Sequence, residues 1–194
     1  MLVAKIIVNV SMLIWVLTPV RQYGGRYFLF FLISALLDPM IMLMHFFIHV
    51  VFFRIYSVAD FIMLITIIDF KKVVQFKYYI IALLAITIYL ADNLTMTEIP
   101  WVIVIENIVT LYLFLKITLL YIDKRKEINI FHVVMDLYLF TLAIKFIAWV
   151  IDIRFGVLYF YITTAFEILI GIFFIFYNDN NSPKLKLRHA ADLE

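Results

Sequence analysis

A carboxylate lies near the middle of the apolar stretch 157–177, where an ionisable side chain is costly and usually serves a function. Thr163 and Tyr159 precede Glu167 by one and two helical turns. Spacing of four keeps the three side chains on one helix face. A carboxylate at this depth in a membrane is suited to carrying a proton or binding a cation. The alternative is a protonated Glu167 that hydrogen-bonds a neighbouring helix and holds a bundle together.

A second apolar stretch carries Ser34, Asp38, His45 and His49 at steps of four, seven and four. These steps place all four side chains in one helical stripe. Pro39 follows Asp38, and a proline removes a backbone donor and can kink the helix. A kink beside a carboxylate suits a binding site or a gate. The alternative is a plain proline kink in which Asp38 caps the freed backbone groups.

The two histidines have a spacing that lets two imidazoles share one metal ion. A catalytic zinc site usually has three protein ligands, however, and the sequence offers no third ligand at the right distance. The metal content is therefore left unknown, with His45 and His49 as weak candidates. Their alternative role is that of histidines at the water-facing end of a helix.

Two further sets of polar residues lie in later apolar stretches. His132 and Asp136 are one turn apart, so they share a face. Asp136 joins Asp38 and Glu167 as a predicted proton- or cation-binding group, with His132 beside it. Glu106 and Lys145 lie at matching depth in consecutive antiparallel segments, which predicts an ion pair that locks the structure.

Asp60 allows two interpretations. The tetrapeptide from Ser57 to Asp60 fits a capping box, with a serine at a helix start and an acid three residues later. Asp60 would then lie near the membrane surface. If the helix begins earlier, Asp60 lies deeper, and the sequence does not decide between these depths.

The composition of the chain indicates the class of protein that carries these side chains. The chain has 194 residues, of which 66% are hydrophobic and 15% charged, with a formal net charge of +2 and a mean hydropathy of +1.08. A soluble domain is roughly 45–50% apolar and about 25% charged. The composition excludes a soluble domain, a disordered chain and a nucleic-acid binder. Because there is no cysteine, disulfides and thiolate metal sites are also excluded.

The apolar stretches predict an all-α, polytopic transmembrane bundle. Little polar sequence separates the second stretch from the third, so a six-helix bundle is the alternative. The seven predicted helices cover residues 2–20, 27–50, 54–70, 78–91, 101–121, 130–151 and 157–177.

Lysine and arginine placement predicts the orientation. With the N-terminus outside, eleven of these residues lie on the inner side and three on the outer side. This bias favours an outer N-terminus, an inner C-terminus and an odd number of spans. Residues 1–177 then form one transmembrane domain and residues 178–194 a short polar cytoplasmic tail. Its final Leu193–Glu194 pair is of the kind that an expression vector leaves behind.

Polar positions recur weakly along the chain. At an offset of 98 residues, Asn9 matches Asn107, and Ser34 and Asp38 match His132 and Asp136. This recurrence predicts two parallel three-helix units joined by the fourth helix. The plan resembles the three-plus-one-plus-three arrangement of sugar and vitamin carriers. The helix count also resembles that of rhodopsins, but the seventh helix has no lysine for a retinal Schiff base, so no cofactor is expected.

Transport of a small solute or ion, linked to protons or cations, is the function that these features favour. The partners would be the lipid bilayer and the solute or ion, in a plasma membrane or a bacterial inner membrane. The alternative is a ligand-sensing or signalling subunit that acts through a membrane or cytoplasmic protein partner. A membrane-embedded enzyme is a third hypothesis, although no catalytic motif supports it.

Overall fold

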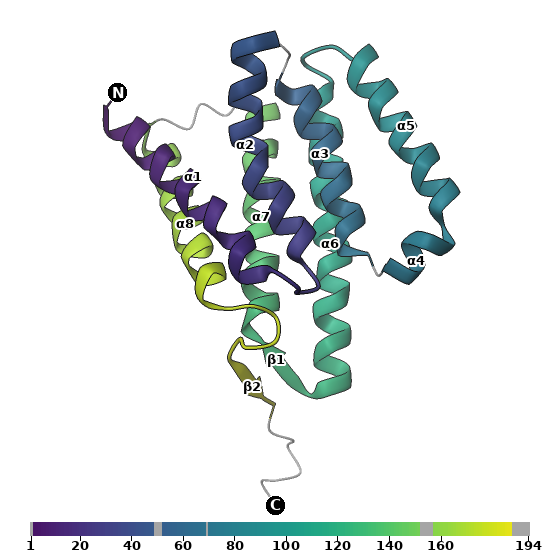
Figure 1. The fold of residues 1–194 in the computed structure, drawn as a ribbon, viewed down its shortest axis with the longest axis vertical. Helices are drawn as coiled ribbons and strands as arrows, with labels where there is room; N and C mark the ends of the chain where they lie inside the picture. The colour runs from purple at the N-terminus through teal and green to yellow at the C-terminus, as the bar shows by residue number, and fades with distance from the viewer. Residues whose placement is uncertain (1, 49–51, 69, 152–156, 188–194) are drawn as a thin grey trace, which may run out of the picture.

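The computed structural model describes residues 2–48, 52–68, 70–151 and 157–187. Within them the chain forms eight helices and one pair of short strands (Figure 1). The elements are α1 (Leu2–Gln22), α2 (Phe28–Ile48), α3 (Phe52–Ile67), α4 (Phe70–Gln75), α5 (Lys77–Asn93), α6 (Ile99–Arg125), β1 (Glu127–Asn129), α7 (Ile130–Val150), α8 (Val157–Phe176) and β2 (Lys184–Lys186).

All seven predicted apolar stretches are helical, and their ends differ from the predicted ends by at most four residues. The all-α fold class is therefore confirmed. α2 and α3 are separate helices, so the alternative that merged them is wrong. The short helix α4 was not predicted, because its six residues are too few to show an apolar period.

Six of the long helices follow one another around a ring. α1 packs against α2, α2 against α3, α3 against α6, and α6 against α7. α8 closes the ring by packing extensively against α1 and more lightly against α7. α5 has α3 as its main partner and stands to one side of the bundle in Figure 1.

Two glycines allow backbone arrangements that other residues would hinder. Gly24 has a φ of +73° in the turn between α1 and α2, a conformation that side chains with a Cβ rarely adopt. Gly171 of α8 faces α1, and a Cβ there would lie 2.7 Å from Cγ2 of Ile14. The contact between α1 and α8 that closes the ring therefore requires glycine at this position.

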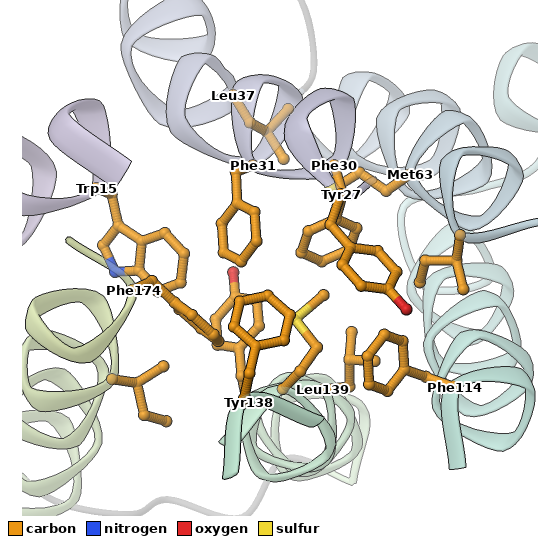
Figure 2. Packing of buried hydrophobic residues seen from close by; sticks show 14 of the residues in the cluster. Trp15, Tyr27, Phe30, Phe31, Leu37, Met63, Phe114, Tyr138, Leu139 and Phe174 are labelled. Atoms are coloured by element: carbon orange, nitrogen blue, oxygen red, sulfur yellow. The ribbon is translucent and has the colours of Figure 1, made fainter. Parts of the chain in front are cut away.

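Aromatic side chains fill the middle of the ring (Figure 2). We call this set the aromatic layer, and its members are Trp15, Tyr27, Phe30, Phe31, Phe114, Phe131, Tyr138 and Phe174. The ring centroids of Trp15 and Tyr138 lie 4.6 Å apart, and those of Phe31 and Phe174 lie 4.7 Å apart. These are the separations at which aromatic pairs attract one another.

The described part of the polar tail, residues 178–187, folds back on the bundle. β2 pairs with β1 in antiparallel register, with Ile128 opposite Leu185. The hydroxyl oxygen of Ser182 accepts a hydrogen bond from the backbone N–H of Phe131 at 2.9 Å. This bond satisfies a donor in the first turn of α7. The segment after α8 is thus attached to the connection between α6 and α7.

Two helices in the described part of the chain, α6 and α7, are long and apolar enough to cross a membrane by length and composition. Residues 6–22, 28–44 and 161–176 form shorter apolar helices.

Candidate functional site

A cavity of about 330 Å³ lies among α1, α2, α3, α7 and α8, on the side of the aromatic layer toward the end of α7. We call it the acidic cavity, because three carboxylates line it together with one ammonium group. Its charged and hydroxyl-bearing lining residues are Ser11, Ser34, Asp38, Tyr56, Asp60, Tyr138, Lys145 and Glu167.

The ion pair in this cavity joins α7 to α8. Nζ of Lys145 lies 2.5 Å from Oε1 of Glu167. The predicted pair between Glu106 and Lys145 is therefore wrong. Both residues were placed at matching depth, but Glu106 lies on the face of α6 that contacts α3, and its carboxylate accepts a hydrogen bond from Ser57.

α2 contributes two side chains that join neighbouring helices. The hydroxyl of Tyr56 in α3 donates to Oδ1 of Asp38 at 2.5 Å. The hydroxyls of Ser34 and Tyr138 lie 3.0 Å apart, which links α2 to α7. Asp38 thus bonds Tyr56 of the neighbouring helix. Asp38, Tyr56 and Pro39 all line the cavity.

A buried polar seam joins α3 to α6. Nδ2 of Asn107 donates to Oδ2 of Asp60 at 2.8 Å, and the hydroxyl of Ser57 donates to Oε2 of Glu106 at 3.3 Å. All four side chains are buried. α3 begins at Phe52, so Ser57 and Asp60 lie inside the helix and the capping-box interpretation is wrong.

We expect Asn107→Leu to lower the free energy of unfolding by about 1–3 kcal/mol, because it leaves the buried Asp60 carboxyl without its donor. The double variant Asp60→Leu/Asn107→Leu should recover most of this loss, since both polar groups are then gone. Thermal unfolding in detergent, followed by circular dichroism, measures both.

Thr110→Val is the matched control for this seam. Thr110 is buried on the same helix, but its hydroxyl donates to the backbone oxygen of Glu106 in its own helix. Its loss should change stability by less than the loss of Asn107. An Asn107→Leu protein as stable as the native one would contradict the structural role of the seam.

The predicted residues His132 and Asp136 do not line the acidic cavity. They lie on α7 between Phe131 and Tyr138, two members of the aromatic layer. Thr118 donates to Oδ2 of Asp136 at 2.8 Å. Nε2 of His132 lies 3.0 Å from Oδ1 of Asp179. Burial acts to raise the pKa of Asp179, but the contact with His132 and the nearby cations outweigh it and hold that pKa below its ordinary value of 3.8.

The structure therefore divides the predicted site. Ser34, Asp38 and Glu167 line the acidic cavity, whereas Thr163 and Tyr159 are not among its lining residues. Thr163 donates to the backbone oxygen of Tyr159 within α8.

Sequence reasoning missed Tyr56 and Tyr138 as cavity residues, and it placed Lys145 in the wrong pair. One signal was available, because Tyr138 and Lys145 are seven residues apart and so share a helix face. Tyr56 and Asp60, four residues apart, share a face in the same way.

The polar contacts do not follow the predicted repeat. Asp60 corresponds to Glu167 only when the offset is shifted to 107 residues. Asn107 bonds Asp60, so the repeat would place its counterpart Asn9 against Glu167. Asn9 is exposed, and Glu167 bonds Lys145. The side-chain pairing therefore does not follow the repeat.

Among the residues that the structure describes, no three histidine or acidic side chains converge on a point that suits a metal ion. His49 lies outside the described residues, and the side chain of His45 is not described. The predicted histidine pair therefore stays a prediction.

No protein-family model, curated protein or solved structure matches the chain.

Proposed function

We propose that this chain is an integral membrane protein whose seven long helices cross the bilayer, with the N-terminus outside and the C-terminus inside. Large apolar side chains on its outer surface support the proposal: Val20 is 74% exposed, Phe46 75% and Leu169 64%. Soluble monomers rarely expose apolar patches of this extent. The excess of lysine and arginine at one end supports the orientation.

Within this membrane protein, we assign the acidic cavity to proton- or cation-linked transport of a small solute or ion. The main support for this proposal is that three carboxylates line one cavity inside the ring of helices. Lys145 neutralises Glu167, and Asn107 holds Asp60. Asp38 is the carboxylate left to exchange a proton for a cation, because its described partner is a neutral hydroxyl and it is exposed, whereas Asp60 is buried.

Tyr56 positions Asp38 in this proposal. An entering cation or proton binds the carboxylate, and the hydroxyl of Tyr56 then turns to another acceptor. Asp136 is a further carboxylate of α7 outside the acidic cavity, and Thr118 orients it. Transport past the bundle centre requires the packed aromatic layer to open transiently.

The test is proton and sodium flux into liposomes that contain the purified chain. We expect Asp38→Asn to lower the flux at least tenfold while leaving the fold unchanged, because the amide keeps the shape and loses the charge. Asp123→Asn is the matched control. Asp123 is an exposed carboxylate that pairs with Lys126 outside the cavity, so its loss should leave the flux unchanged.

A ligand-sensing subunit is the second candidate, and the continuous aromatic layer favours it. Alternating access usually relies on broken helices, whereas the described helices carry few breaks near mid-length, chiefly Pro39. A native protein that gives no flux, yet is stabilised by a bound ligand and copurifies with a partner, would replace the transport proposal with this one.

A further inference from the structure

A second cavity, of about 540 Å³, lies at the opposite end of the bundle from the acidic cavity. It is formed by the ends of α3 and α6, the start of α7, and the segments around Arg26, Lys72 and Asp179. We call it the basic cavity. Its cationic lining residues are Arg26, Lys72, Lys116, Lys124 and Arg125.

None of these five cations forms an ion pair within the described residues, where the pairs are Arg54–Asp92, Lys126–Asp123 and Lys145–Glu167. Arg26 also contacts the ring of Tyr27. Unpaired cations around one concave surface form an anion site.

Asp179 lies near Arg26 and offsets only part of the charge of this cluster. It is the one carboxylate among the described lining residues. Its Oδ1 accepts a hydrogen bond from Nδ2 of Asn129 at 2.9 Å and lies 3.0 Å from Nε2 of His132. The carboxylate is thus held by its neighbours at the strand connection, and the excess of positive charge in the cavity remains.

α6 gives this cavity an amphiphilic wall. Lining residues fall on α6 at 113, 116, 117, 120 and 124, a spacing that follows one helix face. Leu113, Ile117 and Leu120 supply apolar surface along that face, and Lys124 lies at its polar end. A wall that is apolar toward the bundle and cationic at its end suits a molecule with an anionic head and a hydrocarbon tail.

We propose that the basic cavity binds the phosphate headgroup of an anionic membrane lipid, whose acyl chain lies against the apolar face of α6. Basic pockets between transmembrane helices on the cytoplasmic side bind such headgroups, and the orientation proposed above places this end of the bundle there. The site does not depend on transport, and its test reads binding alone.

The test is native mass spectrometry of the full chain in a neutral detergent, with dioleoylphosphatidylglycerol as the probe and dioleoylphosphatidylcholine as the neutral comparison. We expect preferential retention of the phosphatidylglycerol. Each lysine near a membrane surface contributes about fivefold to the binding of anionic lipid. Lys116→Gln/Lys124→Gln should therefore weaken phosphatidylglycerol binding by about 25-fold, and circular dichroism checks that the variant keeps its helices.

Lys77→Gln/Lys186→Gln is the matched control, because it removes the same charge from residues that do not line the cavity. It should bind phosphatidylglycerol within twofold of the native chain. The proposal would be overturned if both double variants lost phosphatidylglycerol binding equally, or if the native chain retained the two lipids equally. Displacement of the lipid by millimolar inorganic phosphate would also overturn it, since the ligand would then be a soluble phosphate.

Discussion

Lys145→Met is expected to lower the free energy of unfolding by about 3 kcal/mol, the low end of the cost of removing one partner of a buried ion pair. The low end applies because Lys145 is 35% exposed, while Glu167 is only 14% exposed. The variant leaves the carboxylate of Glu167 in a largely apolar wall without its ammonium partner. Unfolding in detergent with increasing denaturant, followed by circular dichroism, measures the loss.

The matched double variant Lys145→Met/Glu167→Leu separates the pair from the shape of the cavity. Replacing both charges with apolar side chains of similar size is often neutral or stabilising, so it should recover the lost stability. It should also abolish flux if the pair belongs to the transport route. A stable Lys145→Met variant would contradict the pairing of Lys145 with Glu167, and Glu106→Gln would then test the pair that the sequence predicted.

Phe31→Ala is expected to lower the free energy of unfolding by about 3–5 kcal/mol, because it opens a cavity in the aromatic layer. Phe31 is fully buried. Its ring lies 4.7 Å from that of Phe174 and 6.2 Å from that of Phe131. Thermal unfolding in detergent measures this loss. In liposomes the variant should also leak protons, since Trp15 and Tyr138 of the same packed layer line the acidic cavity.

Phe46→Ala is the control for this prediction. Phe46 lies on the same helix, α2, but it is 75% exposed. Its truncation should change stability by no more than about 0.5 kcal/mol, as for other surface positions, and should leave the flux unchanged. A Phe31→Ala protein that is destabilised but proton-tight would show that the layer supports the fold without sealing the route.

The positions of the long helices followed from the sequence, because a run of apolar residues long enough to cross a bilayer is a strong one-dimensional signal. The strand pair was not predictable in the same way. Its two strands have three residues each and come from segments more than fifty residues apart. The side chains of Asn129 and Ser182 join the two segments by bonding Asp179 and the backbone of Phe131, and such long-range contacts leave no pattern in the sequence.

The candidate site was predictable in part. Asp38 and Glu167 were found because charged groups are rare in apolar helices, and both line the acidic cavity. The partner of Lys145 was missed because depth along a helix can be counted from the sequence, whereas lateral neighbours and rotation cannot. Asp136 was grouped with the acids of the cavity because the sequence does not show which helix each face of α7 meets, and Asp136 contacts Thr118 of α6.

The contact between α1 and α8 affects how the chain is made. The first helix has one of its most extensive interfaces with the last, and the residues between Gln22 and Val157 must be synthesised before that interface forms. At a synthesis rate of about 5–20 residues per second, this takes on the order of ten seconds. During that interval the surface of Ile14 that will receive Gly171 stays open. The nascent chain therefore remains an unclosed ring until α8 has been made.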